Sequence, residues 1–339
     1  MDNSKKATVL FERALELYKA EKFKKAFKLF CKAAELGHVE AKLYVGKCYF
    51  DGNGVQTDAK KAADFFGDAA MLGNAKAQEL FGVCFDAGLG RDEDPDRAFK
   101  WYGVAAENGN IDALNDLGVC YDEGRGVARD KAKAWEYFEL AAEKGNADAM
   151  LNMAYAYLNG DGAEKNGQKA LALYLKAAEL GHAGAMYMLG KIYSDGEIVD
   201  KDARAAAEWF ERSAQGKEPF GEYEYAMCLM YGKGVAVDKA LAFEWFEKAG
   251  ICGVADAWYE LGKCYLDGAG VDKNPYTATY WLGNAAHGNH AGAQALLAEC
   301  YEKGVGVDRD ADKAAELYKQ AAEGGDSQAK CELERFNKR

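Results

Sequence analysis

Apolar residues along this chain recur at helical spacing. In the stretch that begins at Ala41, apolar side chains at positions 41, 45, 48 and 49 form one stripe with the spacing of an amphipathic helix. No segment alternates in the way that a half-buried strand does. A glycine-rich turn follows at 52–54, and a second apolar stretch begins at 59. The pattern predicts a first helix over about 39–50 and a second over about 59–71.

This helix–turn–helix pattern repeats every 36 residues without a gap. Repeats of this length are typical of stacked helical solenoids. A column that begins at Asp58 holds Asp or Asn, which cap the start of the second helices. The sequence therefore predicts an all-α fold, a right-handed α/α superhelical solenoid of about eight repeats. One column holds glycine in all eight copies: Gly52, Gly88, Gly124, Gly160, Gly196, Gly232, Gly268 and Gly304.

We expect a single solenoid domain over residues 1–339, because neighbouring repeats share one continuous core. An N-terminal helix pair (Lys5–Ala20 and Phe23–Leu36) fills 1–36, and a C-terminal capping helix (Ser327–Phe336) lies within 325–339. A glycine closes most second helices. Where Lys217 and Asn289 replace it, the preceding Gly216 and Gly288 are expected to serve instead. The repeats are expected at 37–72, 73–108, 109–144, 145–180, 181–216, 217–252, 253–288 and 289–324.

The charge and the cysteines limit the function classes. A formal charge of −12 argues against nucleic acid and anionic membranes as partners. No apolar run is long enough to span a membrane, and the start of the chain has no signal-peptide pattern. Free thiols and a cytoplasmic, reducing location are expected, because one column mixes cysteines with Ala156 and Ile192, as small buried apolar residues do. Its cysteines are Cys48, Cys84, Cys120, Cys228, Cys264 and Cys300.

Candidate chemistry is sparse. The recurring DGNG-type loops lack the strand and lysine of a phosphate loop and the spaced acids of a calcium loop, so they are interpreted as turns. His38 and His182 share a polar column at the start of the first helices, which indicates a cap. His287 and His290 leave a metal site open as a weaker alternative, without an obvious third ligand. We expect no catalytic residue, no metal and no cofactor, and hence no enzyme.

The repeat resembles the Sel1-like repeat, a relative of the tetratricopeptide repeat, in residues 41–74, which read AKLYVGKCYFDGNGVQTDAKKAADFFGDAAMLGN. The likeness covers about 37–324 and is best in 109–144 and 253–288, and the N-terminal pair looks more like a plain tetratricopeptide unit. The resemblance implies an adaptor or scaffold that binds peptides or proteins in a concave groove. Secreted cysteine-rich members carry a disulfide in each repeat, and this chain lacks their paired cysteines.

If the first helices line the concave face, as the resemblance implies, three successive copies place Tyr187, Tyr223 and Tyr259 on one line. Tyrosine offers contact area and a hydroxyl, methionine adapts its shape, and lysine attracts acidic groups. The same tyrosines could instead pack repeat against repeat. The candidate partner-binding residues are Tyr187, Lys191, Tyr223, Met227, Met230, Tyr231, Tyr259 and Lys263.

The sequence thus predicts a non-catalytic adaptor or scaffold with a protein or peptide partner and no small-molecule substrate. A ligand-binding or hydrolase-like protein with a pocket enclosed by the superhelix is the alternative. Self-association through the groove or the edges is a third hypothesis.

Overall fold

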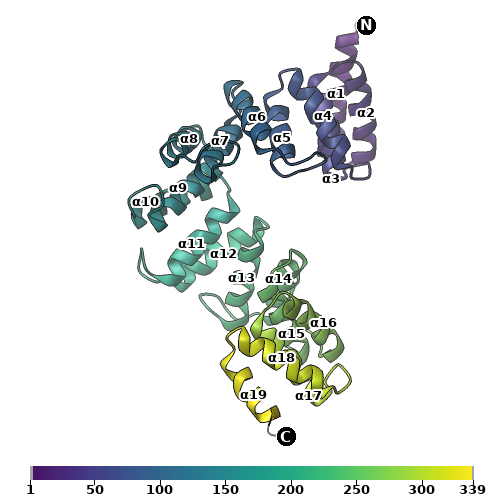
Figure 1. Ribbon diagram of the computed structural model, residues 1–339. Coiled ribbons are helices and arrows are strands. Elements are labelled where there is room, and N and C mark those ends of the chain that lie inside the picture. Colours follow the sequence, from purple (N-terminus) through teal and green to yellow (C-terminus); the bar gives the residue numbers. More distant parts are fainter. Residues whose placement is uncertain (1–2, 338–339) are drawn as a thin grey trace. The chain divides into compact units, whose positions relative to one another are not determined.

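The computed structural model describes residues 3–337, with side chains through Arg335 (Figure 1). Every regular element in this described part is an α-helix, and within each of two units the helices pack in chain order. This confirms the predicted all-α solenoid. The internal contacts form two compact units, one ending at Asn166 and one beginning at Gly167. The prediction of one domain over 1–339 stays a prediction.

In the first unit, each second helix packs against the first helix of its own pair and against the first helix of the next pair. The helices are α1 (Asn3–Lys19), α2 (Phe23–Glu35), α3 (Val39–Asp51), α4 (Ala59–Met71), α5 (Ala75–Asp86), α6 (Pro95–Glu107), α7 (Ile111–Glu123), α8 (Lys131–Glu143) and α9 (Ala147–Asn159).

The second unit repeats this arrangement and ends in a single helix that packs on α18. The helices are α10 (Gly167–Glu179), α11 (Ala183–Asp195), α12 (Ala203–Gln215), α13 (Pro219–Tyr231), α14 (Lys239–Ile251), α15 (Ala255–Asp267), α16 (Pro275–His287), α17 (Ala291–Lys303), α18 (Ala311–Glu323) and α19 (Ser327–Asn337).

The helix ends follow the predicted capping chemistry. The Asp58 carboxylate accepts a hydrogen bond from the Lys61 amide at 3.0 Å, at the start of α4. At the end of α3, Gly52 takes φ +76° in the left-handed region, which glycine adopts at little cost. The carboxylate or amide cap and the left-handed glycine recur along the chain, because each turn leaves helix-end N–H groups to be capped and requires a positive φ.

The expectation about Gly216 and Gly288 is wrong. Both have right-handed φ values, −75° and −76°. The left-handed position falls on the next residue, and Lys217 (φ +61°) and Asn289 (φ +60°) occupy it themselves. Asparagine tolerates this conformation, whereas lysine carries its steric cost. The backbone geometry of the turn is therefore kept where the glycine is lost.

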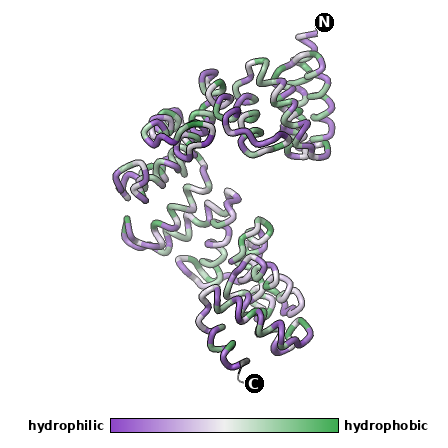
Figure 2. The backbone as a smooth tube through the Cα atoms, in the orientation of Figure 1, coloured by the Kyte–Doolittle hydropathy of each residue, from purple (hydrophilic) through white to green (hydrophobic). Residues whose placement is uncertain are grey.

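The core lies between the paired helices, and each helix has both hydrophilic and hydrophobic positions along the tube of Figure 2. The cysteine column is part of this core. Cys48 is fully buried, and burial raises the pKa of its thiol to about 12. All nine cysteines of the chain are free thiols. The prediction that the column acts as small buried apolar residues is confirmed.

A second loop glycine explains how neighbouring repeats join. In the loop after α13, Gly234 lies so close to the first residue of α12 that an added Cβ would be 1.9 Å from the Ala203 carbonyl oxygen. At one junction the roles are exchanged. Ile198 stands in the loop, Gly167 starts the helix below it, and a Cβ on Gly167 would be 3.0 Å from the Ile198 side chain. The contact between a loop and the helix start beneath it thus requires a glycine at only one of the two positions.

In three copies, a side chain in the first turn of the first helix is hydrogen-bonded to the end of the preceding helix. Gln78, Trp258 and Gln294 donate side-chain N–H groups to carbonyl oxygens eight residues earlier, at 3.1, 2.7 and 3.2 Å. Glu222 holds the same position and, when ionised, has no proton to donate. Its Oε2 is buried without a hydrogen-bond partner in the described part of the chain, and burial raises its pKa.

Glu222→Gln is expected to raise the free energy of unfolding by about 1 kcal/mol near pH 8, because the amide can donate to the Ala214 carbonyl. The raised pKa means that the folded state holds a proton more tightly than the unfolded state. Wild-type stability therefore falls as pH rises through and above the ordinary value of 4.5, and the gain shrinks at acidic pH. Denaturant unfolding at both pH values measures this. The exposed Glu244→Gln is the control, and equal shifts in both variants would contradict the assignment.

Candidate partner-binding face

The three predicted tyrosines occupy one position on α11, α13 and α15, and each is half-buried. Tyr187 packs against Phe210 with ring centroids 6.2 Å apart, and Tyr223 packs against Phe246 at 5.9 Å. Tyr259 stacks on His290 at 4.6 Å. The packing interpretation therefore holds for part of each ring, and it fixes the orientation of the ring.

The hydroxyl ends of these tyrosines are open. Within the described residues, none of the three hydroxyls has a hydrogen-bond partner, and none is a buried unsatisfied atom. Burial raises the pKa of all three phenols, with nearby carboxylates adding to the effect. The hydroxyls stay protonated at neutral pH and can both donate and accept a hydrogen bond. We call α11, α13 and α15 with these side chains the tyrosine face.

The two lysines of the face are paired within the chain. Lys263 Nζ donates to both carboxylate oxygens of Glu260, at 2.9 and 3.0 Å, and to the Tyr231 hydroxyl at 3.4 Å. Burial lowers the pKa of Lys263, but the Glu260 bond outweighs it and raises the pKa to about 12. Lys191 lies 4.0 Å from Glu224. The face is thus closer to neutral than its lysines alone suggest.

Sequence reasoning missed Glu224 and Glu260, although a signal existed. Both occupy the column directly after the tyrosines, and Glu260 lies one helix turn before Lys263. Burial raises the pKa of Glu224, and Lys191 opposes that rise. Pairing across helix turns and repeats therefore holds the lysines in place instead of leaving them free for an acidic partner.

The remaining candidates differ in exposure. Tyr231 is 49% exposed and stands at the end of α13, whereas Met227 is half-buried against the core. Met230 is only 8% exposed and belongs to the core cluster itself. Met230 therefore offers little surface to a partner, and Tyr231 offers the most among these three.

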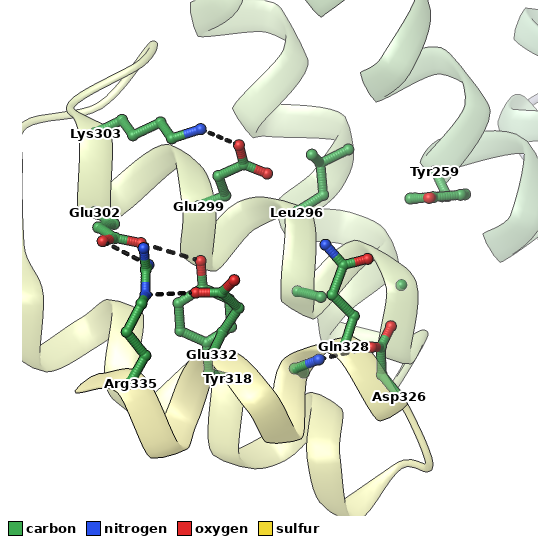
Figure 3. A pocket seen from close by; sticks show the side chains of 13 residues that line it. Tyr259, Leu296, Glu299, Glu302, Lys303, Tyr318, Asp326, Gln328, Glu332 and Arg335 are labelled. Carbon is green, nitrogen blue, oxygen red and sulfur yellow. Dashed lines mark hydrogen bonds and ion pairs between the residues drawn. The ribbon is translucent and has the colours of Figure 1, made fainter. Parts of the chain in front are cut away.

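The tyrosine face ends at a pocket of about 250 Å³, shown in Figure 3. Tyr259 lines one side, and Gln328 and Arg335 of α19 line the other. Arg335 donates to both oxygens of Glu302, at 2.8 and 2.7 Å. Lys303 pairs with one carboxylate oxygen of Glu299, across one helix turn. The pocket is polar, and internal ion pairs offset much of its charge.

The histidines act as helix caps. His38, His182 and His290 each accept a hydrogen bond from a backbone amide through Nδ1, at 3.3, 3.1 and 3.0 Å. The cap interpretation is confirmed for the first two. His290 belongs to the same column, and its Nε2 lies 3.2 Å from Asp256. Among the described residues, no group of three or more His, Cys, Asp or Glu side chains is placed to hold a metal ion.

None of the helices in residues 3–337 combines the length and the apolar character that crossing a membrane requires. Curated proteins give no match to this sequence.

Two solved structures resemble the chain over most of its length. The protective antigen c5321 of uropathogenic Escherichia coli, which displays an SLR fold, is 33% identical with a TM-score of 0.67, and the match covers 91% of this chain and 66% of the antigen. This chain therefore spans slightly less than two thirds of that relative. A Sel1 repeat protein from Oxalobacter formigenes is 28% identical with a TM-score of 0.60, covering 91% and 89% of the two chains.

The repeats themselves match the Sel1 repeat at residues 21–38, 39–74, 75–110, 111–146, 147–182, 183–217, 219–254, 255–290 and 291–326. The first segment includes α2, so the match extends into the N-terminal helix pair. These segments account for most of the sequence. The chain belongs to the Sel1 repeat family.

Proposed function

We propose that this chain is a non-catalytic adaptor or scaffold that binds a peptide or a partner protein along the tyrosine face. Membership in the Sel1 repeat family supports protein binding in general. The observation that carries the finer proposal is the row of Tyr187, Tyr223 and Tyr259. Each ring is held by packing while its hydroxyl stays open, so little side-chain entropy is lost when a partner binds.

The spacing of the face suits an extended or helical segment. Packed helices lie about 8–10 Å apart, so successive tyrosines are separated by roughly that distance. An extended peptide covers it in about three residues. The paired Lys191 and Lys263 supply hydrogen-bond donors on a nearly neutral surface, which favours a partner with apolar and polar side chains over a strongly acidic one.

We also propose a cytoplasmic location. The free thiols support it, because six of them sit in a single column with no second cysteine column to pair with.

Affinity capture from native lysate tests the proposal with three proteins in parallel: wild type, a Tyr187/Tyr223/Tyr259 triple alanine variant, and a Tyr276/Tyr280 double alanine variant. Tyr276 and Tyr280 of α16 are 77% and 62% exposed and lie outside the tyrosine face, so they are a matched control. We expect a partner that wild type and the control retain and the triple variant loses. A partner held equally by all three would move the site elsewhere. Capture of no specific partner by any of them would favour the ligand-binding alternative.

Tyr223→Ala alone is expected to weaken binding of that partner by about 1–2 kcal/mol, or roughly five- to thirtyfold in Kd. Titration calorimetry measures this. Tyr223→Phe keeps the packing on Phe246 and removes only the hydroxyl, so it should retain most of the stability and lose part of the affinity. An unchanged affinity in both variants, or a collapse of the helical fold in the phenylalanine variant, would contradict the assigned role.

A further inference from the structure

The first unit contains no part of the tyrosine face, but it has an apolar pocket on its surface. Its volume is about 390 Å³. Phe50, at the end of α3, lines it and is 49% exposed. The lining also includes aromatic and aliphatic side chains from α1, α3, α5 and the loop after α5: Tyr18, Tyr44, Leu80, Val83 and Leu89.

The pocket walls are held in place by their own contacts. The Tyr18 and Tyr44 rings meet edge to face at 5.8 Å, and the Asn53 amide donates to the Tyr18 hydroxyl at 2.8 Å. Lys47 Nζ stands 5.3 Å from the Tyr44 ring centroid, at the rim. A pocket with aromatic walls and enough room for a large side chain is suited to an anchor residue.

A cluster of carboxylates continues from this pocket along α5 to α7. Glu79, Val83 and Asp86 lie on one side of α5 at helical spacing, so Val83 of the pocket lies between two acids. Lys76 pairs with both Glu79 and Asp112, at 2.6 and 2.9 Å. Glu79 and Asp86 therefore form the side of the cluster that adjoins the pocket.

The cluster is short of cations. Arg125 pairs with Asp86 at 3.0 Å, but Asp116 has no ion-pair partner among the described residues, and its Oδ2 is buried without a hydrogen-bond partner. Burial and the negative charges of Glu79 and Asp112 raise the pKa of Asp116 to about 7. The carboxylates repel one another, and a cation brought by a partner would relieve that repulsion.

We propose that the first unit binds a basic peptide segment whose large apolar side chain enters the Phe50 pocket and whose arginine or lysine side chains meet the Asp86–Asp112–Asp116 carboxylates. The pocket lies at α3 and α5 and the cluster at α5 and α7, one repeat further along, and packed helices lie about 8–10 Å apart. An extended peptide covers this distance in about three residues at 3.3 Å each. The anchor and the basic side chains are therefore two to four residues apart in the bound segment.

The test uses the full chain and a series of fluorescein-labelled glycine–serine peptides that carry one phenylalanine and a pair of arginines, with the separation stepped from one residue to five. Fluorescence anisotropy reports binding. The best separation should bind at least about tenfold more tightly than peptides with serine for phenylalanine or glutamate for arginine. Added salt should weaken the interaction, because the charged half of the site is screened.

Two variants test the apolar part and the charged part of the site separately. Phe50→Ala should weaken the best peptide about tenfold and leave its salt dependence unchanged, since only the anchor contact is lost. Asp116→Asn should weaken it by a similar factor and reduce the salt dependence, since a charge is lost. Met71→Ala is the matched control, because Met71 is 77% exposed in the same unit but lies at the end of α4, outside the site.

The proposal is overturned if no peptide of the series binds better than its glutamate counterpart, or if Met71→Ala has the same effect as Phe50→Ala. Equal binding of the phenylalanine peptide with and without arginines would reduce the site to an apolar pocket and refute the charged half. The site shares no residue with the tyrosine face. The two proposals can therefore fail independently. The tyrosine variants can lose the lysate partner and still bind the peptides normally, or they can keep the lysate partner while no peptide binds.

Discussion

Gly234→Ala is expected to lower the free energy of unfolding by about 3 kcal/mol or more. Two costs add. Gly234 has φ +76°, where a side chain is strained by about 1–2 kcal/mol. The new Cβ would also lie 1.9 Å from the Ala203 carbonyl oxygen. That oxygen belongs to the backbone at the start of α12, so no rotamer change relieves the overlap, and the loop must withdraw from its neighbour.

Gly253→Ala separates these two costs. Gly253 has a comparable φ of +92°, but a Cβ there would meet no atom within 4 Å. Its substitution should cost only about 1–2 kcal/mol, from backbone strain. Urea unfolding followed by circular dichroism gives both values. Similar losses in the two variants would mean that the loop contact contributes little to holding the repeats together.

Asp116→Asn is expected to stabilise the protein by about 1–3 kcal/mol at pH 8. A carboxyl whose pKa rises from 3.8 to about 7 on folding corresponds to ~4 kcal/mol by linkage, and solvent screening of this half-buried group lowers the effect. The folded state binds the proton more tightly than the unfolded state. Stability therefore falls as pH rises from about 4 to 7 and changes little above that, and the asparagine variant lacks this fall.

Thermal or urea unfolding at pH 4.5 and pH 8 checks the expectation. The exposed loop variant Asp92→Asn is the control, and it should change stability by no more than about 0.5 kcal/mol at either pH. Asp116→Asn should strengthen the fold and also weaken binding of the arginine peptides, an opposition typical of binding residues. Equal stability of wild type and Asp116→Asn at pH 8 would contradict the repulsion argued for this cluster.

The helices and their ends could be predicted closely from the sequence. The expected helix over 39–50 is α3 at Val39–Asp51, and the expected helix over 59–71 is α4 at Ala59–Met71. Helix ends are decided by backbone needs within a few residues, such as the Asp58 cap, and those needs repeat in every copy. The same local logic misjudged Lys217 and Asn289, because a turn fixed by its neighbours can force an unfavourable residue into the left-handed region.

The candidate site was harder to predict, because its features depend on contacts between repeats. The tyrosine row was visible as a column, but the pairing of Lys263 with Glu260 and the burial of Met230 depend on how adjacent helix turns and repeats pack. The Phe50 pocket draws on four helices, α1, α3, α4 and α5, and on the loop after α5. The sequence did contain one indication of an exposed apolar side chain. Phe50 occupies a column in which the next two copies have the polar residues Asp86 and Asp122.

The exchanged glycine at Gly167 and Ile198 limits how far these repeats are modular. Each of the two residues belongs to a different copy of the 36-residue unit, so each copy is compatible with only certain neighbours. If a copy with alanine at the Gly167 position were transplanted below the Ile198 loop, two side chains would compete for one space. A protein engineer who shuffles, deletes or adds repeats must therefore cut within a copy, so that each loop travels with the helix start beneath it.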